Sequence, residues 1–466
     1  MNVPTATRGR AGPATTQHRR RSCPPSTKRS DSSEMSGSPA TYRDVFAASE
    51  FRWLWLAHVL SVIGDQLARV ALTLLVFDRT ESAGLAALTY ALTYLPDLVG
   101  GAALAGLADR YPRRDVMVAT DLGRAVMVVA MAIPAVPLAG QMALLVAVQL
   151  VSAPFSAARQ AVLADILTGD RLTLGLGVFS MAYQAGLVLG FGAGAALVAE
   201  LGTSAALVIN AVTFVVSGIL IAYGLGPHPP RLFRPLRGGA GDAAESTIDS
   251  PGDGQWQAIR AGWRVVAHDA RLRTLMAIAC CSGFYVVPEG IAVPYAAEIG
   301  AGTAAVGWLL AANPIGTFIG MLLLRRVRPD RRLALMGPLA VASSAILLPS
   351  GWAPGLPVTF VLWTLSGVFS AHDMVTQATY VEAVPAHRRG QAVGVAIAAL
   401  RAAQGLAIVI AGVVAQVLAP STIIAVAAAL GTVAATVATL RWLRAASSPT
   451  ALSSPPDETD DITGRP

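Results

Sequence analysis

The stretch AGLADRYPRRDV, residues 105–116, decides how this chain is interpreted, because it inserts charged residues between two long apolar segments. Asp109 is followed by the arginines Arg110, Arg113 and Arg114. Two interpretations are open. The arginines alone would hold a loop on the cytoplasmic side of a membrane. Asp109 adds nothing to that topological signal, so the second interpretation makes the loop part of a latch between two conformations.

The composition indicates an integral membrane protein. Of the 466 residues, 54% are hydrophobic and 14% are charged, and the mean hydropathy is +0.56. A helix needs about 20 apolar residues to cross a bilayer, and the pattern predicts roughly twelve such helices in an all-α membrane fold. The predicted spans are residues 52–77, 84–108, 116–137, 142–167, 174–199, 203–224, 273–297, 303–325, 333–351, 356–384, 391–417 and 420–443.

The basic character of the chain does not predict nucleic-acid binding. The formal charge is +7, but the arginines form short clusters between apolar segments, which is typical of membrane topology. Lys28 is the only lysine, so the chain has no phosphate-binding loop of the GxxxxGKS type. Cys23, Cys280 and Cys281 lack the spacing of a disulfide framework or a metal site. We therefore expect no cofactor, no metal and no enzymatic activity.

Arginine clusters recur at every second boundary between predicted spans, from RYPRR after the second span to RWLR after the twelfth. The opposite boundaries carry few basic residues, with Arg79 as the exception. By the positive-inside rule the clustered side is cytoplasmic. The sequence therefore predicts a multi-pass protein of the cytoplasmic membrane with both termini in the cytoplasm.

The spans divide into two sets of six. DRYPRR after the second span recurs as VRPDRR after the eighth, as expected for a chain built from two related halves. The segment WQAIRAGWRVVAHDARLR, residues 256–273, is either an amphipathic helix on the inner membrane surface or an extended start of the seventh span. The predicted domains are a disordered basic tail (1–41, with Met35 as an alternative start), a first half (42–226), a cytoplasmic linker with an amphipathic helix (227–271), a second half (272–444) and a disordered C-terminal tail (445–466).

AGLADRYPRR resembles the GxLADRxGRR signature of the major facilitator superfamily, which lies between the second and third spans as this stretch does. The resemblance extends from about Tyr42 to Arg444 and implies twelve helices in two six-helix halves that work by alternating access. Ala105 and Pro112 stand where the signature has glycine. The resemblance also implies that Asp109 contacts the N-terminal end of the eleventh helix, where a carboxylate gains from the helix dipole.

The fifth predicted span contains GLVLGFGAGA, residues 186–195, which is similar to a degraded GxxxGPxxGG motif of exporters in the same superfamily. The alternative is a close-packing helix face made by Gly186, Gly190, Gly192 and Gly194. A dinucleotide-binding interpretation fails because no strand precedes these glycines. FRWLWLAHVLSVIGDQLARVALTLLVFDRT and SAARQAVLADIL are also similar to exporters of siderophores, macrolides and other secondary metabolites.

Acidic residues inside the predicted spans are candidates for proton coupling, because ionisable groups in a bilayer are costly unless they are paired or wetted. Glu289 follows Pro288 near mid-span with no basic residue within a helical turn. Asp65 lies near the membrane midplane, and Arg69 follows it on the same helix face, so those two could simply neutralise one another. The remaining candidates are Asp373, His372 and Asp97.

Arginines inside the spans predict intramembrane charge pairs with a structural or gating role. Arg124, Arg159 and Arg401 fall in the predicted cytoplasmic halves of their spans, where Asp121, Asp165 or Asp65 could pair with them. Arg159 lies in SAARQAV rather than the RxxQG context of a transport-linked arginine, so that role is not assigned to it.

These features together predict a proton-coupled exporter of a small organic molecule. We expect Glu289, Asp65 and Asp373 to be the proton sites. The expected partners are a small-molecule substrate, protons and the lipid bilayer, without nucleic acid, and the expected state is a monomer. An importer or uniporter of the same fold and a non-transporting membrane sensor or scaffold remain as alternatives.

Overall fold

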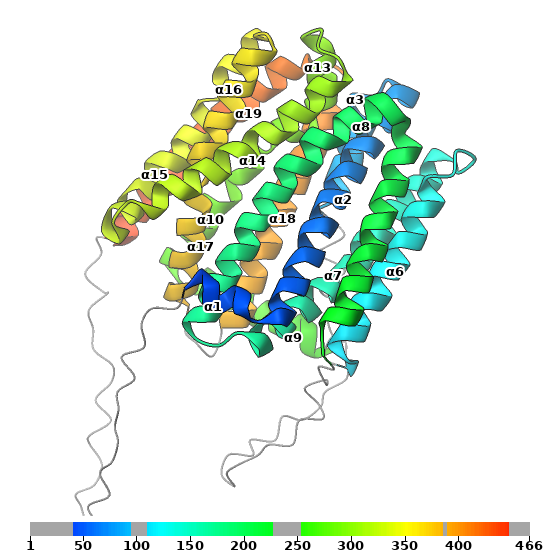
Figure 1. Ribbon diagram of the computed structural model, residues 1–466. Coiled ribbons are helices and arrows are strands. Elements are labelled where there is room, and N and C mark those ends of the chain that lie inside the picture. The colour runs from blue at the N-terminus through cyan, green and yellow to red at the C-terminus, as the bar shows by residue number, and fades with distance from the viewer. Residues whose placement is uncertain (1–40, 95–109, 227–252, 385–388, 447–466) are drawn as a thin grey trace, which may run out of the picture. The chain divides into compact units, whose positions relative to one another are not determined.

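The computed structural model describes residues 41–94, 110–226, 253–384 and 389–446, and within these residues the regular secondary structure is entirely helical. The described residues belong to one compact unit. Its first half contains α1 (Tyr42–Ala47), α2 (Ser49–Thr80), α3 (Ala83–Ala91), α6 (Arg113–Met131), α7 (Leu138–Ile166) and α8 (Asp170–Gly224) (Figure 1). Its second part contains α9 (Asp253–His268), α10 (Ala270–Cys280), α11 (Ser282–Tyr285), α12 (Val287–Gly290), α13 (Ala292–Glu298), α14 (Thr303–Arg325), α15 (Pro329–Ala345), the short 3₁₀ helix η2 (Leu348–Trp352), α16 (Leu356–Ser370), α17 (His372–Ala383), α18 (Arg389–Val414) and α19 (Pro420–Ala446).

The first half is organised around α2. Gly202 has a φ of 81°, which is not helical, and it therefore divides the long helix α8 into two helices. Glycine suits this position because the conformation is strained for residues that carry a Cβ. The two arms of α8 lie on either side of α2 (Figure 1). Gly202 lies at the predicted boundary between the fifth and sixth spans, so α8 contains both of them.

The seventh predicted span is a series of short helices. Single residues, Cys281, Val286 and Ile291, separate α10, α11, α12 and α13, and of these three only Ile291, with φ of −116° and ψ of 21°, departs from helical backbone. Pro288 and Pro294 lack the backbone N–H that a regular helix uses. Glu289 lies in the single turn of α12.

The amphipathic segment before this span is a helix of its own. α9 ends at His268, and the side chain of Asp269 caps α10 by accepting from the backbone amides of Arg271 (2.7 Å) and Leu272 (3.3 Å). A capped start with extended backbone terminates the preceding helix. Of the two interpretations of residues 256–273, the extended start of the seventh span is therefore wrong.

Nine helical segments of the described residues are long and apolar enough to cross a membrane, and one of them is α8, with its two spans. The third predicted span is α6, which carries too many charged residues to be recognised by apolar length. The second predicted span lies mostly outside the described residues. Within these limits the helices follow the predicted order of spans.

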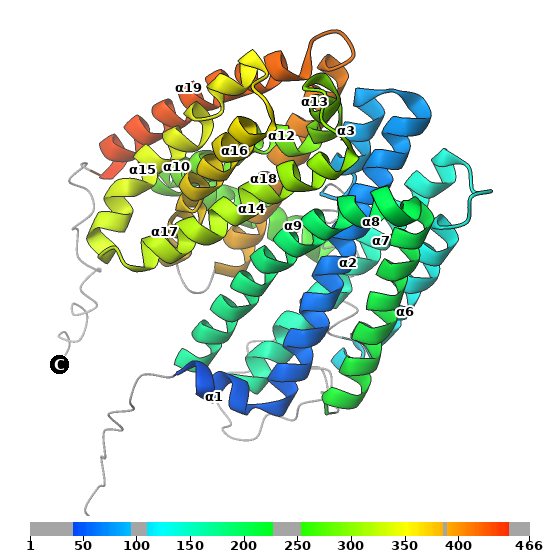
Figure 2. The ribbon, with the colours of Figure 1, turned by 45° about the horizontal axis from the view of Figure 1, so that its top comes forward.

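The two halves meet through small residues at one end of the bundle. A Cβ on Gly412 of α18 would lie 2.3 Å from Cβ of Ala87 in α3. A Cβ on Gly307 of α14 would lie 2.6 Å from Cβ of Ala195 in α8. The largest buried apolar cluster likewise draws residues from both halves. Figure 2 shows α3 beside the C-terminal helices at this end. The described halves are therefore in direct contact here.

Candidate functional site

A hydrogen bond joins the two halves at Glu289. The hydroxyl of Tyr90, in α3, donates to Oε2 of Glu289, in α12, at 2.8 Å across 199 residues of sequence. Tyr90 is fully buried, and Glu289 is partly buried. The short helix α12 places the Glu289 carboxyl opposite α3. The candidate proton site with no basic neighbour in sequence therefore has a partner in the other half.

Two arginines complete this site. The guanidinium carbon of Arg69 in α2 lies 5.3 Å from the ring centroids of both Tyr90 and Tyr94. That of Arg401 in α18 lies 5.3 Å from the Tyr94 ring. Both cations act electrostatically on the Glu289 carboxyl. We refer to Arg69, Tyr90, Tyr94, Glu289 and Arg401 as the interface cluster.

Sequence reasoning identified Glu289, Arg69 and Arg401 separately but missed the two tyrosines. The tyrosines lie four residues apart, on one helical face, and each has one cationic neighbour or more in the structure. A cation over an aromatic ring gains about 0.5–2 kcal/mol. The spacing in TYALTYL was the available signal, although it equally suits an ordinary buried face.

Asp373 and His372 form a second polar group inside the C-terminal half. Tyr285 donates to Oδ2 of Asp373, and Nε2 of His372 lies 3.4 Å from Oδ1 of the same carboxyl. The His372 side chain is fully buried, whereas that of Asp373 is 31% exposed. All three residues belong to one half, so this group makes no contact between halves through these bonds.

Asp65 lies in an ion pair. Nη2 of Arg124 is 2.9 Å from both carboxylate oxygens of Asp65, and Nη1 is 3.5 Å from Oδ1 of Asp121. The Arg124 side chain is 2% exposed, and its guanidinium carbon lies 4.0 Å from the Phe214 ring centroid. The pairing of Asp65 with Arg69 considered from sequence is wrong, because Asp65 contacts Arg124 instead.

The contacts of Arg124 with Asp65 and Asp121 are among those predicted from sequence, whereas those of Arg159 and Asp165 differ from the expectation. Nη1 of Arg159 lies 2.5 Å from Nδ1 of His58, a residue that sequence reasoning had not singled out. Asp165 is paired with Arg113 rather than with Arg124, Arg159 or Arg401. A histidine with no acidic neighbour gave no signal in the sequence.

The loop that opens α6 is described in part. Arg113 is buried and pairs with Asp165 of α7, Arg114 contacts Asp115 at 3.3 Å, and Arg110 is exposed. Arg113 therefore ties the loop to another helix of the same half. Asp97 and Asp109 lie outside the described residues, so the proposed latch remains a prediction.

Three of the four glycines in the fifth span lie against α2. A Cβ on Gly186 would lie 2.7 Å from Cγ1 of Val62, one on Gly190 would lie 2.8 Å from the carbonyl oxygen of Ile63, and one on Gly194 would lie 3.3 Å from Cα of Leu67. Gly192 has no such neighbour within 4 Å. These contacts support the close-packing interpretation of the motif.

The described residues contain no group of three or more His, Cys, Asp or Glu side chains that could hold a metal ion. The interface cluster contains one carboxyl group, two phenols and two guanidinium groups. Such a set can bind and release a proton and can hold an anion.

The family model of the Major Facilitator Superfamily matches residues 54–291 and 289–460. The chain belongs to the Major Facilitator Superfamily. It is an all-α, multi-pass membrane protein with the fold of that superfamily. No match to this chain was found among curated proteins.

Solved structures with the same fold include other members of the superfamily. A bacterial homolog of the human lysosomal transporter Spinster, in an inward-facing and unoccupied conformation, is 17% identical, with a TM-score of 0.56 over 85% of this chain and 95% of that chain. A POT family transporter in complex with a thioalcohol conjugated peptide is 9% identical, with a TM-score of 0.66 over 85% and 96% of the two chains. At these identities the likeness concerns the fold.

Proposed function

We propose that this superfamily member is a secondary active transporter that couples the efflux of a small organic molecule to proton movement at Glu289. The observation that carries the proposal is the hydrogen bond from Tyr90 to Glu289, because it joins a titratable carboxyl in one half to the other half. In alternating access the halves must change their contacts, so a group at this position can link proton binding to that change.

The proton state of Glu289 alters the strength of the contact. A hydrogen bond to a carboxylate is roughly twice as strong as one between neutral groups, and the carboxylate also attracts Arg69 and Arg401. Proton binding therefore loosens the contact between halves, and proton release tightens it.

Efflux by exchange requires that substrate and proton compete for the same group. A substrate with a basic group would be attracted to the Glu289 carboxylate and would displace its proton. The aromatic faces of Tyr90 and Tyr94 would contact its apolar part. The similarity of residues 186–195 to the exporter motif supports this direction.

One observation favours a second candidate, the uptake of an anionic molecule together with a proton. The interface cluster contains two arginines and one carboxyl group, so it carries a net positive charge whether Glu289 is protonated or not. An anionic substrate would bind Arg69 and Arg401 best when Glu289 is protonated. Substrate and proton would then move in the same direction.

The sign of proton movement separates the two candidates. The full chain is reconstituted in vesicles that contain the pH indicator pyranine, and ethidium, erythromycin or p-aminohippurate is added outside. Exchange of an entering cation for a proton raises the internal pH, whereas entry of p-aminohippurate with a proton lowers it. We expect ethidium or erythromycin to raise the internal pH.

Glu289→Gln tests the role of the carboxyl. Glutamine keeps the size and the acceptor oxygen for Tyr90 but cannot exchange a proton, so we expect the substrate-driven pH change to disappear while the protein remains folded. Glu200→Gln, at an exposed position, is the matched control and should behave as the unmodified chain does. An unchanged pH response in folded Glu289→Gln would exclude Glu289 as the coupling group. A chain that moves none of these probes or protons would favour a sensor or scaffold.

A further inference from the structure

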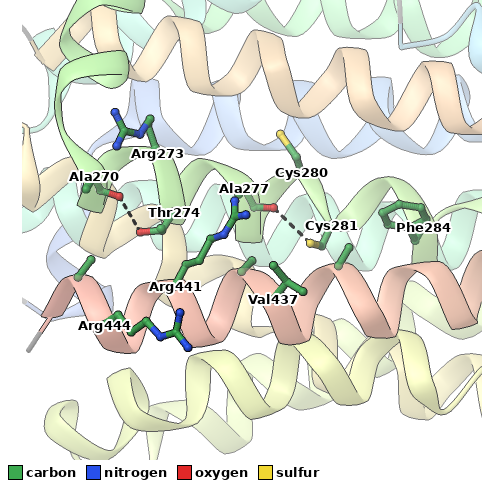
Figure 3. Close-up of a pocket in the computed structure, with 13 residues that line it drawn as sticks. Ala270, Arg273, Thr274, Ala277, Cys280, Cys281, Phe284, Val437, Arg441 and Arg444 are labelled. Carbon is green, nitrogen blue, oxygen red and sulfur yellow. Dashed lines mark hydrogen bonds between the residues drawn. The ribbon is translucent and has the colours of Figure 1, made fainter.

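A second site lies away from the interface cluster, between α10 and α19. A cavity of about 810 Å³ is lined by residues of these two helices and by Phe284 of α11. In Figure 3, Arg273 and Arg444 lie toward one end, Cys281 and Phe284 lie toward the other, and the side chain of Arg441 is drawn between them, beside Ala277. We call this cavity the α10–α19 groove.

Small residues on both helices form the groove. Its walls include Ala270, Ala277, Ala434, Ala438 and Ala445. The polar groups between them are bonded within α10. The hydroxyl of Thr274 donates to the Ala270 carbonyl oxygen at 3.0 Å, and the thiol of Cys281 donates to that of Ala277 at 3.2 Å. The Thr274 hydroxyl and the Cys281 thiol are therefore already bonded, and the alanines beside them are apolar.

The outer face of α19 beside the groove is suited to lipid. Val433, Val437 and Leu440 are 63%, 43% and 50% exposed. In a membrane-spanning helix, apolar side chains with this exposure face acyl chains. The groove therefore adjoins an apolar face rather than a polar one.

The basic end of the groove is suited to an anion, because Arg273 and Arg441 are exposed there. Among the residues that the structure describes, none that lines the groove is acidic, and Arg441 forms no ion pair with any of them. Arg273 donates to the carbonyl oxygen of Ala267, which leaves its positive charge without a counter-charge there. Arginines at a membrane boundary are stabilised by anionic head groups.

We propose that the α10–α19 groove binds an anionic glycerophospholipid. Its phosphate contacts Arg273 and Arg441, and one acyl chain lies along Ala277 and Val437 toward Phe284. From Ala270 to Cys280, α10 rises by about 15 Å, which is about half of the roughly 30 Å hydrocarbon core of a bilayer. The groove thus matches the depth of one leaflet.

Native mass spectrometry of the full chain tests the proposal, with phosphatidylglycerol and phosphatidylcholine added in equal amounts. We expect phosphatidylglycerol to be retained in preference. Each arginine near anionic lipid contributes a roughly fivefold change in affinity, so the double variant R273Q/R441Q should lose most of the retained lipid. R326Q removes an exposed arginine at the end of α14 and should retain it. Ala277→Phe, which fills the apolar part, should also reduce retention while every arginine is kept.

Four outcomes would overturn the proposal. They are equal retention of the two lipids, equal losses in R326Q and R273Q/R441Q, unchanged retention in Ala277→Phe, and displacement of the lipid by inorganic phosphate alone.

Discussion

At the scale of single residues, Arg124 shows how an intramembrane charge is stabilised. Its guanidinium group contacts both oxygens of Asp65 and one oxygen of Asp121, whose side chain is fully buried. Breaking a buried pair costs more than forming it gains, because the partner remains as an uncompensated charge. Asp65 is therefore better suited to holding α2 against α6 than to exchanging protons. Glu289, whose bond is to a phenol, is better suited to proton exchange.

Arg124→Gln should destabilise the protein strongly. It leaves Asp65 and Asp121 without their cation, at a cost of roughly 3–5 kcal/mol, so the midpoint of thermal unfolding in detergent should fall. Arg114→Gln, which affects a contact on the surface with Asp115, is the control and should change stability by less than about 0.5 kcal/mol. Similar unfolding midpoints for the two variants would show that the Arg124 pairs contribute little.

At the scale of helices, the fifth span approaches α2 through alternate glycines. Gly190 lies against the backbone of Ile63, and Gly192, two residues on, faces away from that contact. Helix pairs in membranes commonly pack through such small residues. The four glycines of this motif thus include three that contact α2 and one that does not. The rotation of the helix about its axis decides which of them face α2.

Gly190→Ala and Gly192→Ala should differ in sign. The added methyl group at Gly190 would lie 2.6 Å from Cβ of Gln66, and overpacking of this kind costs about 1–3 kcal/mol. At Gly192 the methyl group meets nothing within 4 Å, and alanine gains about 0.5–1 kcal/mol over glycine in a helix. Thermal unfolding of both variants in the same detergent is the measurement. A more stable Gly190→Ala would contradict the packing described here.

At the scale of the whole molecule, the contact between α3 and α18 is one that the proposed alternating access would break. A Cβ on Gly84 would lie 2.4 Å from the side-chain nitrogen of Gln416 and 3.2 Å from the carbonyl oxygen of Gly412. These residues come from different halves. If the halves rock during transport, a covalent bond at this place should hold the protein in one state.

Cysteines at Gly84 and Gln416, in a chain whose native cysteines are replaced, should form a disulfide on oxidation. We expect oxidation to abolish the substrate-driven pH change and reduction to restore it. Gly337→Cys with Thr439→Cys joins α15 to α19 within one half, where Cβ of residue 337 would lie 3.1 Å from Cβ of Thr439, and should leave transport intact. Continued transport with the first pair cross-linked would exclude separation at this contact.

The sequence by itself determined the fold and the identity of several charged candidates. Apolar length and arginine spacing are local properties, so they identified the order of the spans, and the repeat and signature indicated the superfamily. The break at Gly202 and the charges of Glu289, Arg69 and Arg401 were also readable, because each depends on the residue type at one position.

Only the tertiary structure decided which charges meet. Asp65 contacts Arg124 from another helix rather than Arg69 from its own, and Tyr90 reaches Glu289 across 199 residues. The α10–α19 groove likewise depends on two helices about 160 residues apart in the chain,. Pairing at such separations follows from helix rotation and from the docking of the two halves. The spacing of residues along one segment does not encode the rotation of a helix or the way in which the two halves dock.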